Sequence, residues 1–192
     1  MFPNYPLLTI IILSLLLVTT SNQFSLPSIF TSEVKAKTTT KQQTNPIFQP
    51  TLAELKAKTQ IPIRLPQDIP DSAGSPIYVS LKTAIPDQYL IELALARDCY
   101  GATACRLGEL SGEKKTSQSA ILRGQKVTLT KGITGYFTPS VCGANCSDAT
   151  LIWEQDGSHY TVSLKAGKME NLKRMANSAI ASSPLTIQEL RS

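Results

Sequence analysis

The clearest structural signal in the chain is the sequence of residues 151–164, LIWEQDGSHYTVSL. Asp156 and Gly157 readily adopt the positive φ angles of a type I′ turn, which joins two antiparallel strands. Apolar and polar residues alternate on both sides of this turn, so Trp153 and Tyr160 fall on faces that we expect to be buried. The stretch therefore predicts a β-hairpin with one face in a hydrophobic core.

Several segments before this hairpin also alternate with a period of two. Residues 89–97 have helix formers as well, but Tyr89 and the alternation favour a strand. Residues 112–119 are polar and predict a loop, and Lys131 with Gly132 predicts a tight turn. The expected strands are residues 77–81, 89–97, 106–111, 126–130, 133–138, 151–155 and 158–164.

Two helices are expected, one before the strands and one after them. Thr51 and Glu54 have the spacing of a capping box at the start of a short helix, which must end before Pro62. An apolar stripe predicts an amphipathic helix over residues 168–181. The fold class predicted is α+β: a meandering antiparallel sheet of about six or seven strands, with a short N-terminal helix and an amphipathic C-terminal helix.

The N-terminus carries an apolar stretch, Leu7 to Val18, of the length of a signal-peptide core and short for a membrane span. The first 32 residues contain no Lys or Arg, which is unusual for a secretory signal, so an uncleaved anchor is the alternative. We therefore expect a signal peptide or N-terminal anchor at residues 1–36. A flexible linker at 37–50 and a single α+β domain at 51–192 are expected to follow.

The chain has four cysteines in two close pairs, Cys99 with Cys105 and Cys142 with Cys146. An even number of closely spaced cysteines on an exported chain predicts disulfides, and thus a periplasmic or extracellular location. In a simple meander the two loops fall at opposite ends of the sheet, which favours pairing within each loop. Zinc binding and redox chemistry are alternatives that the spacing and the lack of a Cys-x-x-Cys disfavour.

No catalytic motif is present: the chain has no nucleophile elbow, no His-Glu-x-x-His and no phosphate-binding glycine loop. The single histidine, His159, alternates out of phase with Tyr160, so an exposed strand residue is expected rather than a catalytic base. The net charge of +5 is ordinary for a small domain and does not indicate nucleic-acid binding. We expect no catalytic, metal or cofactor site. The acidic residues are scattered over Glu92, Glu109, Glu113, Asp148, Glu154 and Asp156.

Four stretches of the chain, taken together, are similar to the sequence of a known domain family. These are TLAELKAKTQIPIRLPQDIP at residues 51–70, GITGYF at 132–137, IWEQDGSHY at 152–160, and the helix that ends at Ile180. In this order they resemble a bacterial extracytoplasmic domain of unknown function, found in secreted lipoproteins and in the outer parts of anti-sigma factors. The resemblance implies an α+β domain outside the cytoplasm with no known enzymatic activity. The four cysteines depart from the broad pattern of this family and are similar to those of a secreted subgroup of uncharacterised cyanobacterial exported proteins.

These observations predict an exported, non-catalytic binding or interaction module of the periplasm or cell envelope. The expected partner is an envelope protein, a wall polymer or a lipid, with no nucleic acid, and Leu7 to Val18 can anchor the chain to a membrane. One alternative is a small hydrolase in which folding brings a carboxylate near His159. Another is a lipid-handling module with an apolar groove between the sheet and the C-terminal helix.

Overall fold

The computed structural model describes residues 44–70, 74–100, 102–119 and 121–185. The predicted signal peptide or anchor, with its apolar stretch Leu7 to Val18, and residues 37–43 of the predicted linker lie outside these ranges. Over the described ranges, no helix combines the length and the apolar character needed to cross a bilayer.

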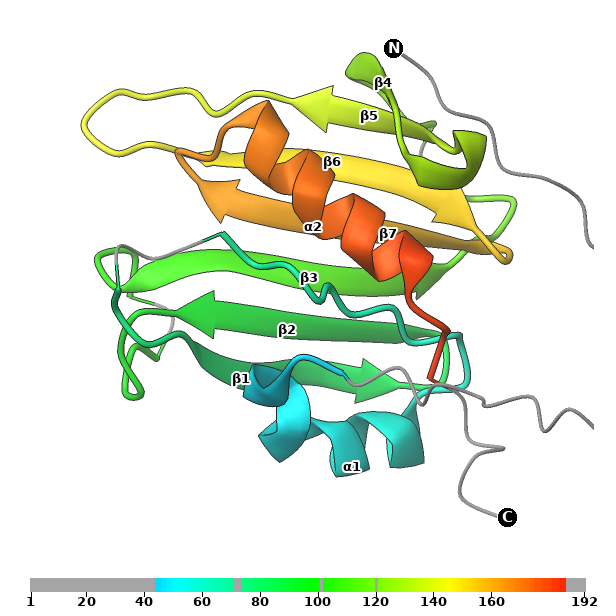
Figure 1. The fold of residues 1–192 in the computed structure, drawn as a ribbon, viewed down its shortest axis with the longest axis horizontal. Coiled ribbons are helices and arrows are strands. Elements are labelled where there is room, and N and C mark those ends of the chain that lie inside the picture. The colour runs from blue at the N-terminus through cyan, green and yellow to red at the C-terminus, as the bar shows by residue number, and fades with distance from the viewer. Residues whose placement is uncertain (1–43, 71–73, 101, 120, 186–192) are drawn as a thin grey trace, which may run out of the picture. The chain divides into compact units, whose positions relative to one another are not determined.

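An antiparallel sheet of seven strands, with helices on one face, confirms the predicted α+β class (Figure 1). The helical elements are η1 (Pro46–Phe48), α1 (Gln49–Lys58), η2 (Thr130–Gly132) and α2 (Met169–Ala181). The strands are β1 (Tyr78–Ile85), β2 (Gln88–Ala94), β3 (Arg106–Lys114), β4 (Gln125–Thr128), β5 (Thr134–Thr138), β6 (Asp148–Gln155) and β7 (Ser158–Lys165).

The strand order is β1-β2-β3-β7-β6-β5-β4, so the sheet consists of two meanders rather than one. β1 to β3 form the first meander and β4 to β7 the second, and they join where β3 pairs with β7. After β3 the chain therefore crosses to the far edge of the sheet through residues 115–124, a segment that we call the crossover. The β3–β7 pairing places Leu110 opposite Val162, which merges the two apolar faces into one core.

Glycines on β3 allow this strand to approach its neighbours closely. A Cβ atom at Gly108 would lie 2.0 Å from the carbonyl oxygen of Ser163 on β7, and one at Gly112 would lie 2.4 Å from Cε1 of Tyr89. Gly112 thus leaves room for the buried Tyr89 ring to lie across β3. Gly108 leaves room for the β7 backbone, so the junction between the meanders depends on the missing side chain.

The strand pairing and the close approach at Gly108 give a first prediction. We expect Gly108→Ala to lower the free energy of unfolding by about 1–3 kcal/mol, because the methyl group overlaps backbone atoms that cannot rotate away. Gly143→Ala is the control, since a Cβ there meets no heavy atom within 4 Å, and it should change stability by less than ~0.5 kcal/mol. Urea denaturation followed by circular dichroism measures both. Equal stabilities would show that the junction tolerates the extra group.

One face of the sheet is covered by α1, α2 and the extended segment of residues 59–70 (Figure 1). α2 lies across β6 and β7, and its apolar stripe is buried against them. The stripe consists of Leu172, Met175, Ala176, Ala179 and Ile180. The extended segment buries Ile61, Ile63 and Leu65, and its carbonyl groups accept hydrogen bonds from buried tyrosines. Tyr89 donates to the carbonyl of Arg64 (3.1 Å) and Tyr160 to that of Pro62 (2.8 Å).

Arg64 is a buried cation that ties this segment to the β6–β7 hairpin. Its guanidinium forms an ion pair with Asp156 in the hairpin turn and donates a hydrogen bond to the carbonyl of Ser182 (3.3 Å). The guanidinium carbon also lies 5.9 Å from the centre of the Tyr160 ring, within the range of a cation–π contact. The covering segment is therefore held by polar as well as apolar contacts.

The N-terminal helix begins earlier than predicted. Residues 46–50 are helical rather than part of a linker, because the fully buried Phe48 fixes this part of the chain against the core. The expected capping box does not form. Thr51 lies inside α1, where its hydroxyl donates to the carbonyl of Phe48 (3.0 Å), and Glu54 pairs instead with Lys58 (2.6 Å).

Several other local predictions are confirmed. Asp156 and Gly157 have φ angles of 50° and 71°, which confirms the turn of the hairpin, and residues 88–94 form a strand as preferred. β3 extends to Lys114 into the predicted polar loop, because pairing with β2 and β7 satisfies its backbone groups. Trp153 is 1% exposed and is a core residue, as expected.

A second prediction concerns the buried Tyr89. Burial raises the pKa of Tyr89 well above its ordinary value, and burial also raises that of Tyr160. Unfolded tyrosines ionise near pH 10 while the folded ones stay neutral, so stability is present below this pH and is lost as pH rises above it. Each such tyrosine steepens the loss by up to ~1.4 kcal/mol per pH unit.

The measurement is urea unfolding at a series of pH values from neutral to strongly alkaline. We expect the free energy of unfolding of Tyr89→Phe to decline less steeply than that of the wild type above about pH 10. The variant also loses the hydrogen bonds of the hydroxyl group, which lowers its stability by the same amount at every lower pH. Tyr100→Phe is the matched control, since Tyr100 is 90% exposed, and should keep the wild-type slope. Parallel slopes for all three proteins would contradict the assignment.

Candidate functional site

Both helices lie on one face of the sheet, so the opposite face is left to strand side chains and loops. Tyr136, Glu154 and His159 point to this face, because each alternates with a buried core residue. Those core neighbours are Phe137, Trp153 and Tyr160. Glu154 and His159 also lie directly opposite one another in the β6–β7 pairing. Three adjacent strands therefore bring these polar side chains together.

A groove of about 490 Å³ opens on this face, beside the turn between β6 and β7. Tyr136, Glu154 and His159 form its floor. Its walls are residues that flank the sheet: Lys115, Ser119, Ile121 and Leu122 of the crossover, with Ile133 and Thr134 beside β5. The volume lies within the roughly 300–1,000 Å³ of small-molecule sites. The groove exists because the crossover passes from the centre of the sheet to its edge.

Lys115, Glu154 and His159 form the charged cluster of the groove. The Lys115 Nζ lies 2.8 Å from each carboxylate oxygen of Glu154, and the His159 Nε2 lies 3.8 Å from Oε2 of Glu154. The hydrogen bond from Lys115 lowers the pKa of Glu154 below its ordinary value, so this carboxylate stays ionised at neutral pH. The Lys115 and Glu154 charges thus balance within the groove.

His159 faces away from the core, as predicted, but the prediction that it is exposed is wrong. Only 14% of its side chain is accessible, because it lies on the groove floor beside Glu154. A hydrolytic base also needs a nucleophile within hydrogen-bond reach. Among the described residues, no hydroxyl group forms a hydrogen bond with His159, and Lys115 donates to both oxygens of Glu154. The groove thus places an imidazole beside an ionised carboxylate, and both are polar groups that a ligand can contact.

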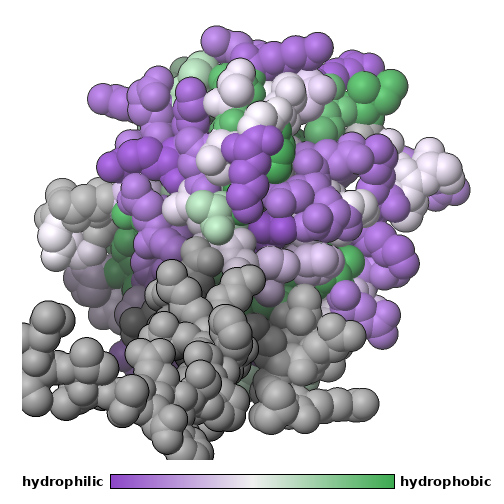
Figure 2. Space-filling model, turned by 45° about the vertical axis from the view of Figure 1, so that its right-hand side comes forward, coloured by the Kyte–Doolittle hydropathy of each residue, from purple (hydrophilic) through white to green (hydrophobic). Residues whose placement is uncertain are grey.

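Apolar side chains stand next to this cluster. Ile121 is 82% exposed at the groove wall, and Leu122 and Ile133 are partly buried there. Figure 2 shows one side of the molecule, on which hydrophilic residues predominate and hydrophobic residues form separate small areas. A concave site that combines apolar walls with a few convergent polar groups has the typical make-up of a ligand site.

Sequence reasoning found one residue of this site and missed the others. It singled out His159 but treated Glu154 as one of several scattered acids. The two-residue alternation in residues 134–138 and 151–160 places Tyr136, Glu154 and His159 on one face of the sheet. This pattern could have predicted that the three side chains lie close together. The contribution of the crossover could not have been found, because it depends on the strand order.

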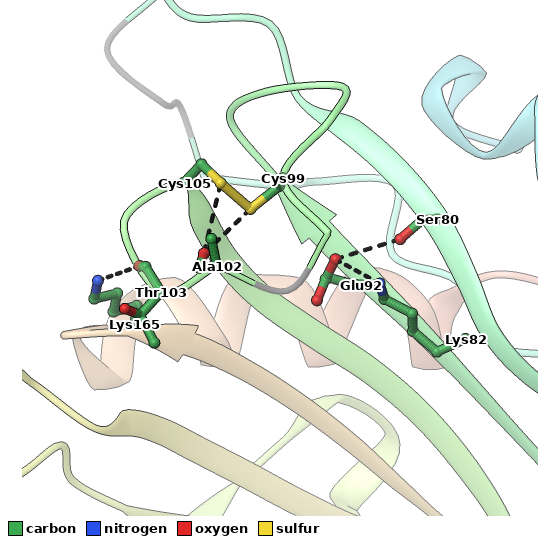
Figure 3. Close-up of a disulfide and its surroundings, with 8 residues drawn as sticks. All are labelled: Ser80, Lys82, Glu92, Cys99, Ala102, Thr103, Cys105 and Lys165. Atoms are coloured by element: carbon green, nitrogen blue, oxygen red, sulfur yellow. Dashed lines mark hydrogen bonds and ion pairs between the residues drawn. A yellow bond between two sulfur atoms is a disulfide. The ribbon is translucent and has the colours of Figure 1, made fainter.

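The cysteines form the two local disulfides, Cys99 with Cys105 and Cys142 with Cys146; Figure 3 shows the first. The pairing agrees with the prediction, but the reason given for it is wrong. β2 and β5 run in the same direction, because four antiparallel pairings separate them, so both loops lie at one end of the sheet (Figure 1). All four sulfurs are used, which leaves none to bind zinc. Two disulfides are typical of proteins that fold in an oxidising environment.

Polar contacts connect the bases of the two disulfide loops. Arg106, next to Cys105, makes hydrogen bonds of 3.0 and 2.6 Å to the carboxylate of Asp148 on β6. Ser163 on the intervening strand β7 donates to the same carboxylate (3.1 Å). Lys165 donates to the carbonyl of Thr103 in the first loop (Figure 3). The disulfide-bridged end is therefore a cross-linked structure rather than two separate loops.

A third prediction concerns the contribution of the disulfides to stability. Each closes a short loop, and loop-closure entropy gives about 2 kcal/mol per bridge. We expect Cys142→Ser/Cys146→Ser to lower the free energy of unfolding by about this amount while leaving the circular dichroism of the sheet unchanged. Reduction of the wild type with dithiothreitol should lower it by about twice as much. Complete loss of folding after reduction would show that the core cannot hold the sheet alone.

The described residues contain no group of three His, Cys, Asp or Glu side chains that could hold a metal ion. Comparison of the chain with protein families, curated proteins and solved structures finds no match. The resemblance to the extracytoplasmic domain therefore stays a prediction.

Proposed function

We propose that the protein is an exported, non-catalytic binding module of the periplasm or cell envelope, with the groove on the uncovered sheet face as its ligand site. One observation carries this proposal: Tyr136, Glu154 and His159 converge from three strands beside the exposed apolar side chain of Ile121. The two disulfides and the resemblance to an extracytoplasmic domain support the location.

The groove favours an amphipathic ligand with little net charge. Lys115 and Glu154 neutralise each other, so a strongly charged ligand would have to break an existing ion pair. Ile121, Leu122 and Ile133 offer apolar contact on one side. His159 and Tyr136 offer hydrogen bonds on the other. A segment of a wall polymer has this combination of groups, and so does a peptide segment of an envelope protein.

The two alternative functions receive less support from the geometry. A hydrolase would need a nucleophile beside His159, yet no hydroxyl group of the described residues forms a hydrogen bond with this imidazole. A lipid-handling module would need space between α2 and the sheet, yet the apolar stripe of α2 is 0% exposed and fills this interface. Binding in the groove is therefore the function that we favour.

The fourth prediction tests this site by nuclear magnetic resonance. Titration of the isotope-labelled protein with soluble wall-polymer fragments, and separately with short amphipathic peptides, should shift amide signals of the crossover and of the ends of β5, β6 and β7. His159→Ala and Tyr136→Ala should weaken binding about tenfold, which corresponds to ~1.4 kcal/mol. The control Glu170→Ala, an exposed residue on α2 over the opposite face, should keep the wild-type affinity.

Two outcomes would overturn the proposal. The first is the absence of any groove-localised shift with either class of ligand. The second is turnover in a screen of ester, amide and glycoside substrates that His159→Ala abolishes, which would make the protein an enzyme.

A further inference from the structure

We propose that the disulfide-bridged end of the sheet docks on an anionic lipid membrane surface through the apolar side chains of Tyr100 and Val141. This surface is distinct from the groove, which lies at the opposite end of the sheet, where β3 ends and β7 begins.

The first observation is the exposure of large apolar side chains. Five large hydrophobic residues are exposed in the described part of the chain, and three of them lie at this end: Tyr100 (90%), Val141 (74%) and Leu95 (39%). Tyr100 follows Cys99 in the first disulfide loop, and Val141 precedes Cys142 in the second. The apolar side chains are thus placed at the two most strongly cross-linked loops.

The second observation is that hydrogen bonds hold the described residues of both loops in place. Beside the first disulfide, the Ala102 amide donates to the carbonyl of Cys99 (2.8 Å). At the second, Val141 and Ser147 exchange hydrogen bonds of 2.9 Å in both directions. A fixed loop presents its apolar side chain without a further ordering cost on binding. The exposure of Tyr100 and Val141 is therefore a property of the folded loops.

The third observation is the spacing of the loops, which selects the kind of partner. Four strand spacings separate β2 from β5, or about 19 Å at about 4.8 Å each. The polar contacts of Arg106, Asp148 and Lys165 occupy the stretch between them. One compact apolar ligand cannot reach both loops across this polar stretch. A lipid surface can accept each apolar side chain separately while the polar stretch lies among the headgroups.

The fourth observation is the chemistry of the residues at this end. Tyrosine is suited to a membrane interface, because its ring is apolar and its hydroxyl stays in contact with water. The cations Arg97, Lys165 and Lys168 lie near the two loops. The acids at this end are Asp98, Glu170 on the first turn of α2, and Asp148 and Glu109, which both pair with Arg106. Anionic headgroups attract such cations within a short distance of the membrane. With few inserted side chains, the binding should be weak and reversible.

The experiment is co-sedimentation with vesicles of phosphatidylcholine plus phosphatidylglycerol, against vesicles of phosphatidylcholine alone. The wild type should bind the anionic vesicles more tightly than the neutral ones. Tyr100→Ser/Val141→Ser should weaken this binding about tenfold or more, whereas Ile85→Ser should change it less than about twofold. Ile85 is the matched control, since it is 49% exposed at the opposite end of the sheet. The same form of the chain is used throughout, so that any contribution of Leu7 to Val18 is common to all variants.

A second measurement locates the contact directly. Tyr100→Trp should be quenched by brominated lipid in anionic vesicles, and Ile85→Trp should not. Trp153 is 1% exposed, so its fluorescence contributes the same background in both variants. All substituted residues are exposed, and thermal unfolding verifies that each variant folds. The proposal is overturned if the wild type does not bind anionic vesicles, if the double variant binds as tightly as Ile85→Ser, or if both tryptophans are quenched equally. Groove binding is measured without lipid, so the two proposals can fail independently.

Discussion

The pairing of β3 with β7 is the constraint on which the rest of the structure depends. Seven residue pairs join two meanders that would otherwise be separate small sheets. The pairing merges their apolar faces into one core, which the covering helix and the extended segment then bury. It also fixes the directions of all seven strands, and these directions place the two disulfide loops at one end and the groove at the other.

The two faces of the sheet divide structure from function. The covered face holds the core and a few buried polar groups, of which Arg64 and Tyr89 are paired through backbone and side-chain contacts. The uncovered face holds ion pairs near the disulfides and the groove near the β6–β7 turn. Most of the core residues therefore take no part in the proposed binding, and Ile133 is an exception that both lines the groove and packs against the core.

Much of the fold could be predicted from local patterns, whereas the site could be predicted only in part. The alternation around Trp153 and Tyr160 and the turn at Asp156 specify their hairpin, since side-chain period and turn chemistry are local properties. The order of the strands is not local: it depends on which two edges bury the most apolar surface together. From the sequence alone, Lys115 and Ile121 are therefore predicted only to be loop residues, with no link to the groove. The start of α1 was also missed, because burial of Phe48 outweighs the capping signal at Thr51.

The short edge strand β4 has a consequence for how the groove can respond to its surroundings. β4 pairs with β5 through only four residue pairs, and the crossover leads directly into it. Elements with so little pairing separate from a domain at a lower free energy than the core strands. We therefore expect the β4 edge, beside the Ile121 wall, to open at a lower free energy than the other six strands. Ligand capture and protection of the β4 amides against hydrogen exchange are then linked, since a bound molecule must be lost before this edge can open.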